Sequence, residues 1–267
     1  MEPWYIIVAL IQGLVEWLPI SSEGQVFLFV YNIDSIAPSE ITTLVVWLHL
    51  GTAMAVLVRY PRTILEIITL RDRKLLQLLV IATLGTALTA MPIYMYFRTA
   101  LTDTQGELLN VVVGVLLLVT AIVLYLPVRG TSQEEEINTQ EPDGQTAVIT
   151  GLIQGFSVLP GLSRSGLTVS SLLMQKVDKE TALRFSFLMS VPAVLGIFAV
   201  ELLVGGAMLP SIDPLDLVAM EAIVFAAGLL SMEALLRLAR QIRFWKLCLV
   251  LGLVAIFFGL PALLLHI

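Results

Sequence analysis

The sequence contains little charge, cysteine or histidine for its length. Of its 267 residues, 13% are charged, one is cysteine and two are histidine. The lone Cys248 excludes an intramolecular disulfide framework and a cysteine-based metal site. A net charge of −6 argues against nucleic acid as a partner. Because no basic region precedes the first apolar run, we expect no cleavable signal peptide.

Apolar residues, in contrast, are abundant. They make up 58% of the chain, more than the interior of a soluble domain of this size can bury. A helix needs ~20 apolar residues to cross the ~30 Å hydrocarbon core of a bilayer. We therefore predict an all-α, polytopic protein of the plasma membrane. Its six expected transmembrane helices lie near residues 41–58, 75–97, 107–126, 181–204, 215–236 and 244–265.

Two further apolar segments are interrupted and too short to cross alone. Residues 4–18 and 26–33 flank Pro19, and residues 146–158 and 166–175 flank Pro160. Non-helical backbone at membrane depth survives only where protein buries it or where it lines a wet cavity. Each segment therefore predicts a re-entrant helix–loop–helix pair that enters and leaves on one side.

The two interrupted segments repeat one plan. At an offset of 142 residues, Ile-Gln-Gly from Ile11 aligns with Ile-Gln-Gly from Ile153, and a serine and a glycine also coincide. The acidic stretch 127–145 predicts a solvated linker. We expect two repeats, 1–126 and 146–267, each with one re-entrant pair and three spans. An odd number of crossings separates the pairs, so the repeats are inverted, an arrangement known in membrane proteins.

The basic residues give the expected orientation. Thirteen of the fifteen fall on the side opposite the N-terminus, and Arg98 alone falls on the N-terminal side. The positive-inside bias places both termini outside the cell and the linker in the cytoplasm. The first re-entrant pair would then enter from outside, so that the site opens outward.

The first loop carries an acid at membrane depth. Gln12 and Glu16 share one helix face at i, i+4. An ionisable group inside the membrane is a functional candidate by default. The alternatives for Glu16 are a place near the interface or a structural ion pair.

The second loop carries the only basic residue of either pair, Arg164. Ser163, Ser165 and Gly166 surround it at the start of a predicted helix, where free N–H groups favour an anion. Guanidinium also binds phosphate in a bidentate manner. The alternative is that Arg164 only neutralises Glu16.

Ser21 and Ser22 are candidate nucleophiles, with Glu16 as the base that would remove the proton. Serines in membrane helices are otherwise hydrogen-bonding contacts between helices. The residues thus indicate a buried anion site built from glutamate, serine and arginine. They do not choose the anion.

These residues resemble the undecaprenyl-diphosphatase, or bacitracin-resistance, family. One family motif, Pro-x-Ser-Ser-x-Gly-His, compares with Pro19 to Gln25. The second, Pro-Gly-x-Ser-Arg-Ser-Gly, is matched fully by Pro160 to Gly166. The stretches HLGTAMAVLV from His49 and RFSFLMSVPAVLG from Arg184 are also similar, so the resemblance covers nearly the whole chain.

The resemblance implies hydrolysis of a polyprenyl diphosphate, the C55 lipid carrier, to the monophosphate and phosphate. The implied catalytic residues are Glu16, Ser22 and Arg164. Ser21, Ser163, Ser165 and Gly166 would join Arg164 in binding the substrate phosphates. A divalent cation, Mg²⁺ or Ca²⁺, would be held by Glu16, with Gln12 and Glu23 as further ligands. The bilayer, the lipid and a second copy of the chain are the expected partners.

The sequence departs from the family pattern at two positions. Gln12 replaces the first glutamate of the family, and Gln25 replaces its histidine. Gln12 can still offer an oxygen to a metal, but Gln25 cannot act as an acid. Glu23 and His49 are candidates to compensate, with Gln25 and His49 placed around the catalytic groups. The alternative for His49 is a hydrogen-bonded packing role.

The main rival function is transport. Inverted repeats with broken helices are typical of transporters, and a polyprenyl-phosphate flippase would need the same anion cradle. Hydrolysis requires a nucleophile and a base, whereas transport does not.

Overall fold

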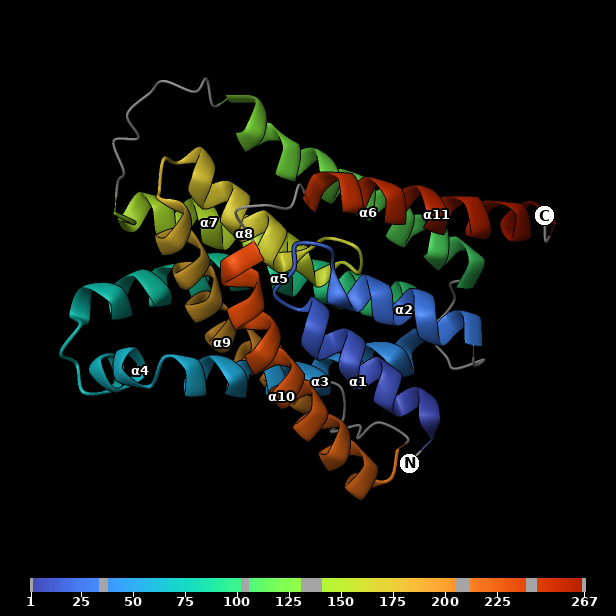
Figure 1. Ribbon diagram of the computed structural model, residues 1–267, viewed down its shortest axis with the longest axis horizontal. Helices are drawn as coiled ribbons and strands as arrows, with labels where there is room; N and C mark the ends of the chain where they lie inside the picture. The colour runs from blue at the N-terminus through green and yellow to red at the C-terminus, as the bar shows by residue number, and fades with distance from the viewer. Residues whose placement is uncertain are drawn as a thin grey trace.

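The chain is all-helical in the computed structural model (Figure 1), as the sequence predicts. The structure describes residues 2–33, 38–101, 106–130, 141–204, 212–238 and 244–265. Within them, the helices are α1 Pro3–Val15, α2 Ser22–Ile33, α3 Pro38–Arg59, α4 Pro61–Ile68, α5 Arg73–Leu101, α6 Gly106–Gly130, α7 Gly144–Gly155, the short 3₁₀ turn η1 Phe156–Val158, α8 Arg164–Met174, α9 Lys179–Val204, α10 Pro214–Leu238 and α11 Phe244–Leu265.

Four helices are long and apolar enough to cross a membrane in the described part of the chain. They cover Glu40–Arg59, Arg73–Tyr96, Lys179–Leu203 and Pro214–Ala234. These coincide with four of the six predicted spans. The other two predicted spans lie on α6 and α11, whose described apolar stretches, Val111–Leu126 and Cys248–Phe257, are shorter.

Both interrupted segments fold as a helix, a loop and a second helix. The loops end in matching serine turns: Gly24 N–H donates to Ser21 Oγ at 3.2 Å, and Gly166 N–H donates to Ser163 Oγ at 3.1 Å. Such a side-chain acceptor satisfies an N–H group that a helix start leaves without a partner. Ser21 adopts a left-handed conformation with φ of 59°.

The shared Ile-Gln-Gly motif has a packing reason. α1 packs along α10, and α7 packs along α5. A Cβ on Gly13 would lie 2.7 Å from Ala227 Cβ, and a Cβ on Gly155 would lie 1.8 Å from Thr89 Oγ1. Only glycine allows such an approach of two helices. The two aligned glycines therefore each lie at a close helix crossing.

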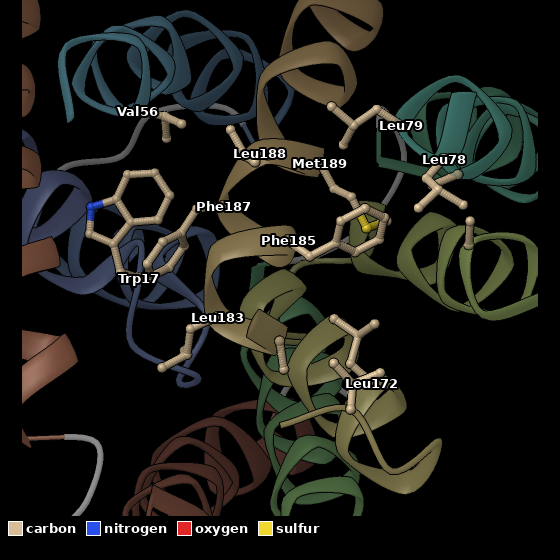
Figure 2. Packing of buried hydrophobic residues seen from close by; sticks show 14 of the residues in the cluster. Trp17, Val56, Leu78, Leu79, Leu172, Leu183, Phe185, Phe187, Leu188 and Met189 are labelled. Carbon is tan, nitrogen blue, oxygen red and sulfur yellow. The ribbon is translucent and has the colours of Figure 1, made fainter. Parts of the chain in front are cut away.

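The remaining long helices complete the body. α6 and α11 lie side by side at the upper edge of Figure 1, and α3 packs against both α9 and α10. Trp17, Phe187 and Leu172 belong to one buried apolar cluster, which gathers side chains from both halves of the chain (Figure 2). The cluster includes Trp17, the residue that follows Glu16 in the chain.

Two features differ from the sequence prediction. The short helix α4 was not predicted, because eight residues give too little apolar length to stand out in the sequence. α6 continues to Gly130, into the predicted linker 127–145, of which residues 131–140 lie outside the described residues. Lys74 Nζ contacts Glu141 Oε2 at 2.7 Å just beyond this gap.

Candidate active site

The tips of the two loops meet, as the repeat in the sequence predicts. Arg164 Nη2 donates a hydrogen bond to Glu16 Oε1, forming an ion pair between the halves. Backbone contacts fix the same junction: Gly161 N–H donates to Ser21 Oγ at 3.0 Å, and Ser165 Oγ donates to the Leu18 carbonyl at 3.1 Å. The acid and the guanidinium therefore share one site, although they come from different halves.

The second carboxylate oxygen of Glu16 is surrounded by donors. Ser22 Oγ donates to Oε2 at 2.6 Å, and Gln12 Nε2 donates to it at 2.9 Å. His49 Nε2 lies 3.4 Å from the same atom. Glu16 is 5% exposed, so these groups replace water around its charge. A serine hydroxyl that donates to a buried carboxylate is the arrangement expected of a nucleophile and its base.

His49 is held in place from its own helix. Its Nδ1 lies 2.6 Å from the Val45 carbonyl, one turn earlier in α3. That contact points Nε2 towards Glu16. The structure therefore brings His49 beside the carboxylate, and its role in compensating for Gln12 and Gln25 stays a prediction.

The guanidinium of Arg164 packs against an aromatic side chain, Trp17. It lies 5.8 Å from the centroid of the Trp17 ring, which is 1% exposed. Trp17 Nε1 donates to the Gly228 carbonyl at 2.8 Å, and its ring meets Phe187 edge to face at 5.1 Å (Figure 2). Trp17 was not predicted as a site residue, because a tryptophan in an apolar run cannot be distinguished by sequence from a packing residue.

A cavity of about 120 Å³ lies beside this junction. Its lining includes the polar residues Arg164, His49, Glu23 and Gln154. It also includes apolar residues from α3, α5 and α9, namely Val45, Val46, Ala90, Val194 and Ile197. A cavity lined by both charged and apolar side chains suits a ligand that is itself amphipathic.

The remaining predicted serines are tied into the loops. Ser163 N–H donates to Thr120 Oγ1 at 3.2 Å, and Ser163 Oγ lies 3.2 Å from Ser165 Oγ. Ser21 Oγ accepts from Gly24 and Gly161. Because hydroxyls can donate while they accept, these contacts leave phosphate binding by the serines as a prediction. The backbone N–H of Gly166 donates to Ser163 Oγ, the helix cap described above.

The two other polar residues of the first loop lie differently. Glu23 lines the cavity and makes no hydrogen bond or ion pair within the described part of the chain. Gln25 instead turns its Nε2 to the Ile20 carbonyl at 3.2 Å and is not on the cavity wall. The structure therefore brings Glu23, but not Gln25, to the cavity.

The oxygens of the site bear on the predicted cation. Among the described residues, no group of three or more His, Cys, Asp or Glu side chains could hold a metal ion. Gln12 Oε1 is buried without a hydrogen-bond partner, next to the Glu16 carboxylate. Carboxylate and amide oxygens are ligands that Mg²⁺ and Ca²⁺ accept, and Mg²⁺ is often held by one or two carboxylates together with substrate phosphates. The residues fit a cation that arrives with a phosphorylated substrate.

The fold and the site define an integral membrane protein with a buried acid–serine–arginine centre. A family model, "Bacitracin resistance protein BacA", matches residues 5–256, so the chain belongs to the BacA family of multi-pass membrane proteins.

Three similar proteins are all named undecaprenyl-diphosphatase. The Haloarcula marismortui protein is 39% identical over 265 residues, with 96% of each chain covered. The Methanothrix thermoacetophila protein is 38% identical over 251 residues, with 94% of each chain covered. The Methanopyrus kandleri protein is 36% identical over 270 aligned positions, with 98% of each chain covered. The chain thus spans nearly the full length of these relatives.

Proposed function

We propose that this protein is an undecaprenyl-diphosphatase, which hydrolyses undecaprenyl diphosphate to the monophosphate and phosphate and so recycles the lipid carrier of cell-envelope glycans. The proposal depends above all on the contact between Ser22 and Glu16 beside Arg164. The candidate nucleophile and its base meet the guanidinium of Arg164 at one junction, and Arg164 in turn lines the neighbouring cavity. The names of the full-length relatives support the same substrate.

In the first step, the diphosphate competes with Glu16 for the guanidinium of Arg164. In the empty site Arg164 is paired with Glu16. A terminal phosphate in the cavity offers Arg164 a bidentate anionic partner. As Arg164 turns to the phosphate, Glu16 loses its counter-charge and becomes free to accept a proton. Binding and activation of the base are thus coupled through one side chain.

Phosphoryl transfer follows at Ser22. Its proton passes to Glu16 Oε2, 2.6 Å away, as Oγ attacks the terminal phosphorus in line. The bond between that phosphorus and the bridging oxygen breaks, and polyprenyl monophosphate leaves. Water then hydrolyses the phosphoserine and releases phosphate. In an alternative scheme, Ser22 does not attack but positions a water molecule, which attacks the terminal phosphorus instead. Stabilisation of the phosphoryl charge by Arg164 contributes most of the rate in either version.

A divalent cation, when bound, would neutralise charge on the diphosphate oxygens. Glu16, Gln12 and Glu23 are the residues that would hold it, because one carboxylate and one unpartnered amide oxygen lie together and the second carboxylate lines the cavity.

We further propose that the two halves are inverted repeats and that the site faces outward. Exchange of the halves maps the α1–α10 packing onto the α7–α5 packing, as a two-fold relation between repeats 1–126 and 146–267 requires. The cavity lies towards the start of α3 and the ends of α5 and α9. With both termini outside, as the positive-inside bias indicates, these ends lie in the outer leaflet.

Transport of a lipid phosphate remains the second candidate, supported by two broken helix pairs meeting at one anion site. Phosphate release separates the two functions. Purified protein in detergent, given undecaprenyl diphosphate and Mg²⁺, is expected to release phosphate without any gradient. Movement of labelled lipid between leaflets without phosphate release would support transport instead.

Matched variants test whether the site performs the reaction. Glu16→Gln and Arg164→Gln are expected to reduce turnover by roughly 10²-fold or more, because each removes a charge from the reaction centre. Arg59 and Glu233 form an ion pair of the same chemistry at 3.1 Å, half-exposed and away from the cavity. Arg59→Gln and Glu233→Gln are therefore controls that should retain turnover. Near-normal phosphate release from Glu16→Gln would contradict the scheme.

A further inference from the structure

One polar atom of a cavity-lining residue, Gln154 Oε1, is buried without a hydrogen-bond partner in the described part of the chain. Gln154 lies at the end of α7 and is 2% exposed. It lines the cavity together with Arg164 and His49. It aligns in the repeat with Gln12, but the scheme above gives Gln154 no part.

The surrounding hydrogen bonds fix the orientation of this amide. Gln154 Nε2 donates to Thr86 Oγ1 at 3.0 Å. Thr86 Oγ1 in turn lies 2.9 Å from the Ala82 carbonyl and 3.1 Å from the Gly151 carbonyl, both of which only accept. The hydroxyl proton of Thr86 is therefore directed to a carbonyl, and its oxygen can only accept from Gln154. A flipped amide would lose that bond, so Oε1 is the atom left over.

An unpartnered acceptor is a costly feature in a buried site. Leaving such an acceptor unsatisfied destabilises the folded protein, whereas an apolar side chain of the same shape avoids this cost. Packing alone therefore gives no reason for an amide here. A hydrogen-bond donor supplied by a ligand in the cavity would satisfy Oε1.

The chemistry of an amide carbonyl restricts what that donor can be. A fully ionised phosphate oxygen would be repelled by Oε1, while an O–H group would donate to it. Arg164 offers only donors, so it selects ionised oxygens. Together, the two residues distinguish an ionised oxygen from a protonated one at the same headgroup.

We propose that Gln154 is a headgroup-binding residue contributed by the second repeat, whose Oε1 accepts a hydrogen bond from an O–H group bound in the cavity. Two sources share this chemistry: the protonated terminal phosphate and a water molecule that takes part in hydrolysis. The proposal rests on the proposed function for the identity of the headgroup. The unpartnered atom itself does not depend on it.

The test compares Gln154→Met with Gln175→Met in purified, detergent-solubilised protein. Methionine keeps the length of the side chain and removes both the acceptor Oε1 and the Nε2 donor that bonds Thr86, so Thr86→Val serves as a second control for the loss of that bond. Gln175 is the matched control, because its Nε2 bonds Thr150 and Ser171 and it does not line the cavity. Calorimetry with inorganic phosphate measures binding without turnover, and steady-state phosphate release gives kcat and KM.

The two sources give different results for Gln154→Met. If Oε1 binds the phosphate hydroxyl, inorganic phosphate should bind roughly five- to tenfold more weakly, as the loss of one neutral hydrogen bond implies. That loss should be larger below pH 7, where phosphate keeps more of its protons. If Oε1 binds water, kcat should fall while phosphate binding and KM stay constant. Gln175→Met should change neither quantity.

A purely structural role would appear differently. Gln154→Met and Thr86→Val would then lower the melting temperature alike, with kcat, KM and phosphate affinity unchanged per folded molecule, and the proposal would be overturned. Failure of the wild-type protein to release phosphate would instead refute the proposed function, and the calorimetric comparison would still decide the role of Gln154.

Discussion

The hydroxyl of Ser22 donates to Glu16 Oε2 across 2.6 Å, while the other oxygen of the same carboxylate holds Arg164. One acid thus links the proposed nucleophile to the side chain proposed to bind phosphate. Its two oxygens have separate partners, so each partner can be removed without removing the other.

Replacement of Ser22 by alanine is expected to lower kcat by about 10²- to 10⁴-fold, the usual contribution of a positioned nucleophile and base. The protein should remain folded, because one lost hydrogen bond costs only about 1 kcal/mol. Phosphate release by Ser22→Ala and by its neighbour Ser21→Ala provides the comparison. A larger loss of kcat in Ser21→Ala than in Ser22→Ala would contradict the assignment of Ser22 as the nucleophile.

The pair Glu16 and Arg164 should behave as one unit. We expect the double variant Glu16→Gln/Arg164→Gln to lose hardly more activity than the worse single variant, because residues that share a site couple strongly. Kinetics of the two single variants and the double variant give the coupling. Simple additivity of the losses would mean that the two side chains act independently.

Trp17 should affect Arg164 without touching substrate. Trp17→Phe keeps an aromatic face but removes the hydrogen bond to the Gly228 carbonyl, and Trp17→Leu removes both contacts. Cation–π contacts contribute about 0.5–2 kcal/mol. We therefore expect KM to rise more in Trp17→Leu than in Trp17→Phe. Equal kinetics for the two variants would limit Trp17 to packing.

The glycine at the α7–α5 crossing should tolerate no side chain. A Cβ on Gly155 would lie 1.8 Å from Thr89 Oγ1 and 2.7 Å from Ala90 N, whereas a Cβ on Gly196 would have nothing within 4 Å. Overpacking of this kind costs typically 1–3 kcal/mol, so Gly155→Ala should lower the melting temperature. Gly196→Ala should leave it unchanged or raise it, because alanine favours a helix. Thermal melts in detergent compare them.

Acid should weaken the start of α9. Hydrogen bonds from Thr181 to Asp178 lower the pKa of that carboxyl below its ordinary value. A carboxyl with a lowered folded-state pKa stabilises the fold above its unfolded value of about 3.9. This contribution is lost as pH falls through the folded-state pKa. Between pH 6 and pH 3, the melting temperature should therefore decrease less for Asp178→Asn than for the wild type.

The residues of the site that belong to the repeated motifs could be predicted from the sequence. Glu16 and Arg164 stand out because charge is rare in an apolar chain, and the shared Ile-Gln-Gly and serine motifs predict that their loops correspond. The packing role of the repeated glycines could not be predicted, because it depends on which helices cross, and the same holds for Trp17 beneath Arg164.

Other features depend on contacts that only the structure provides. Gln154 belongs to the repeated Ile-Gln-Gly motif, but the motif does not reveal that its Nε2 bonds Thr86 while its Oε1 has no partner in the described part of the chain. Helix α4 is too short for an apolar pattern to identify it. Gln25 was expected near the catalytic groups, and the structure turns it to the loop backbone because a carbonyl lies within reach.

The junction between the two loops also has a consequence for how the chain can be divided. The Gly161 N–H to Ser21 Oγ bond and the Glu16–Arg164 pair both join residues that the stretch between α6 and α7 separates. Co-expression of two fragments, cut after Gly130, should therefore restore what each fragment lacks alone. A substitution at this junction in one half therefore alters contacts that the other half also needs.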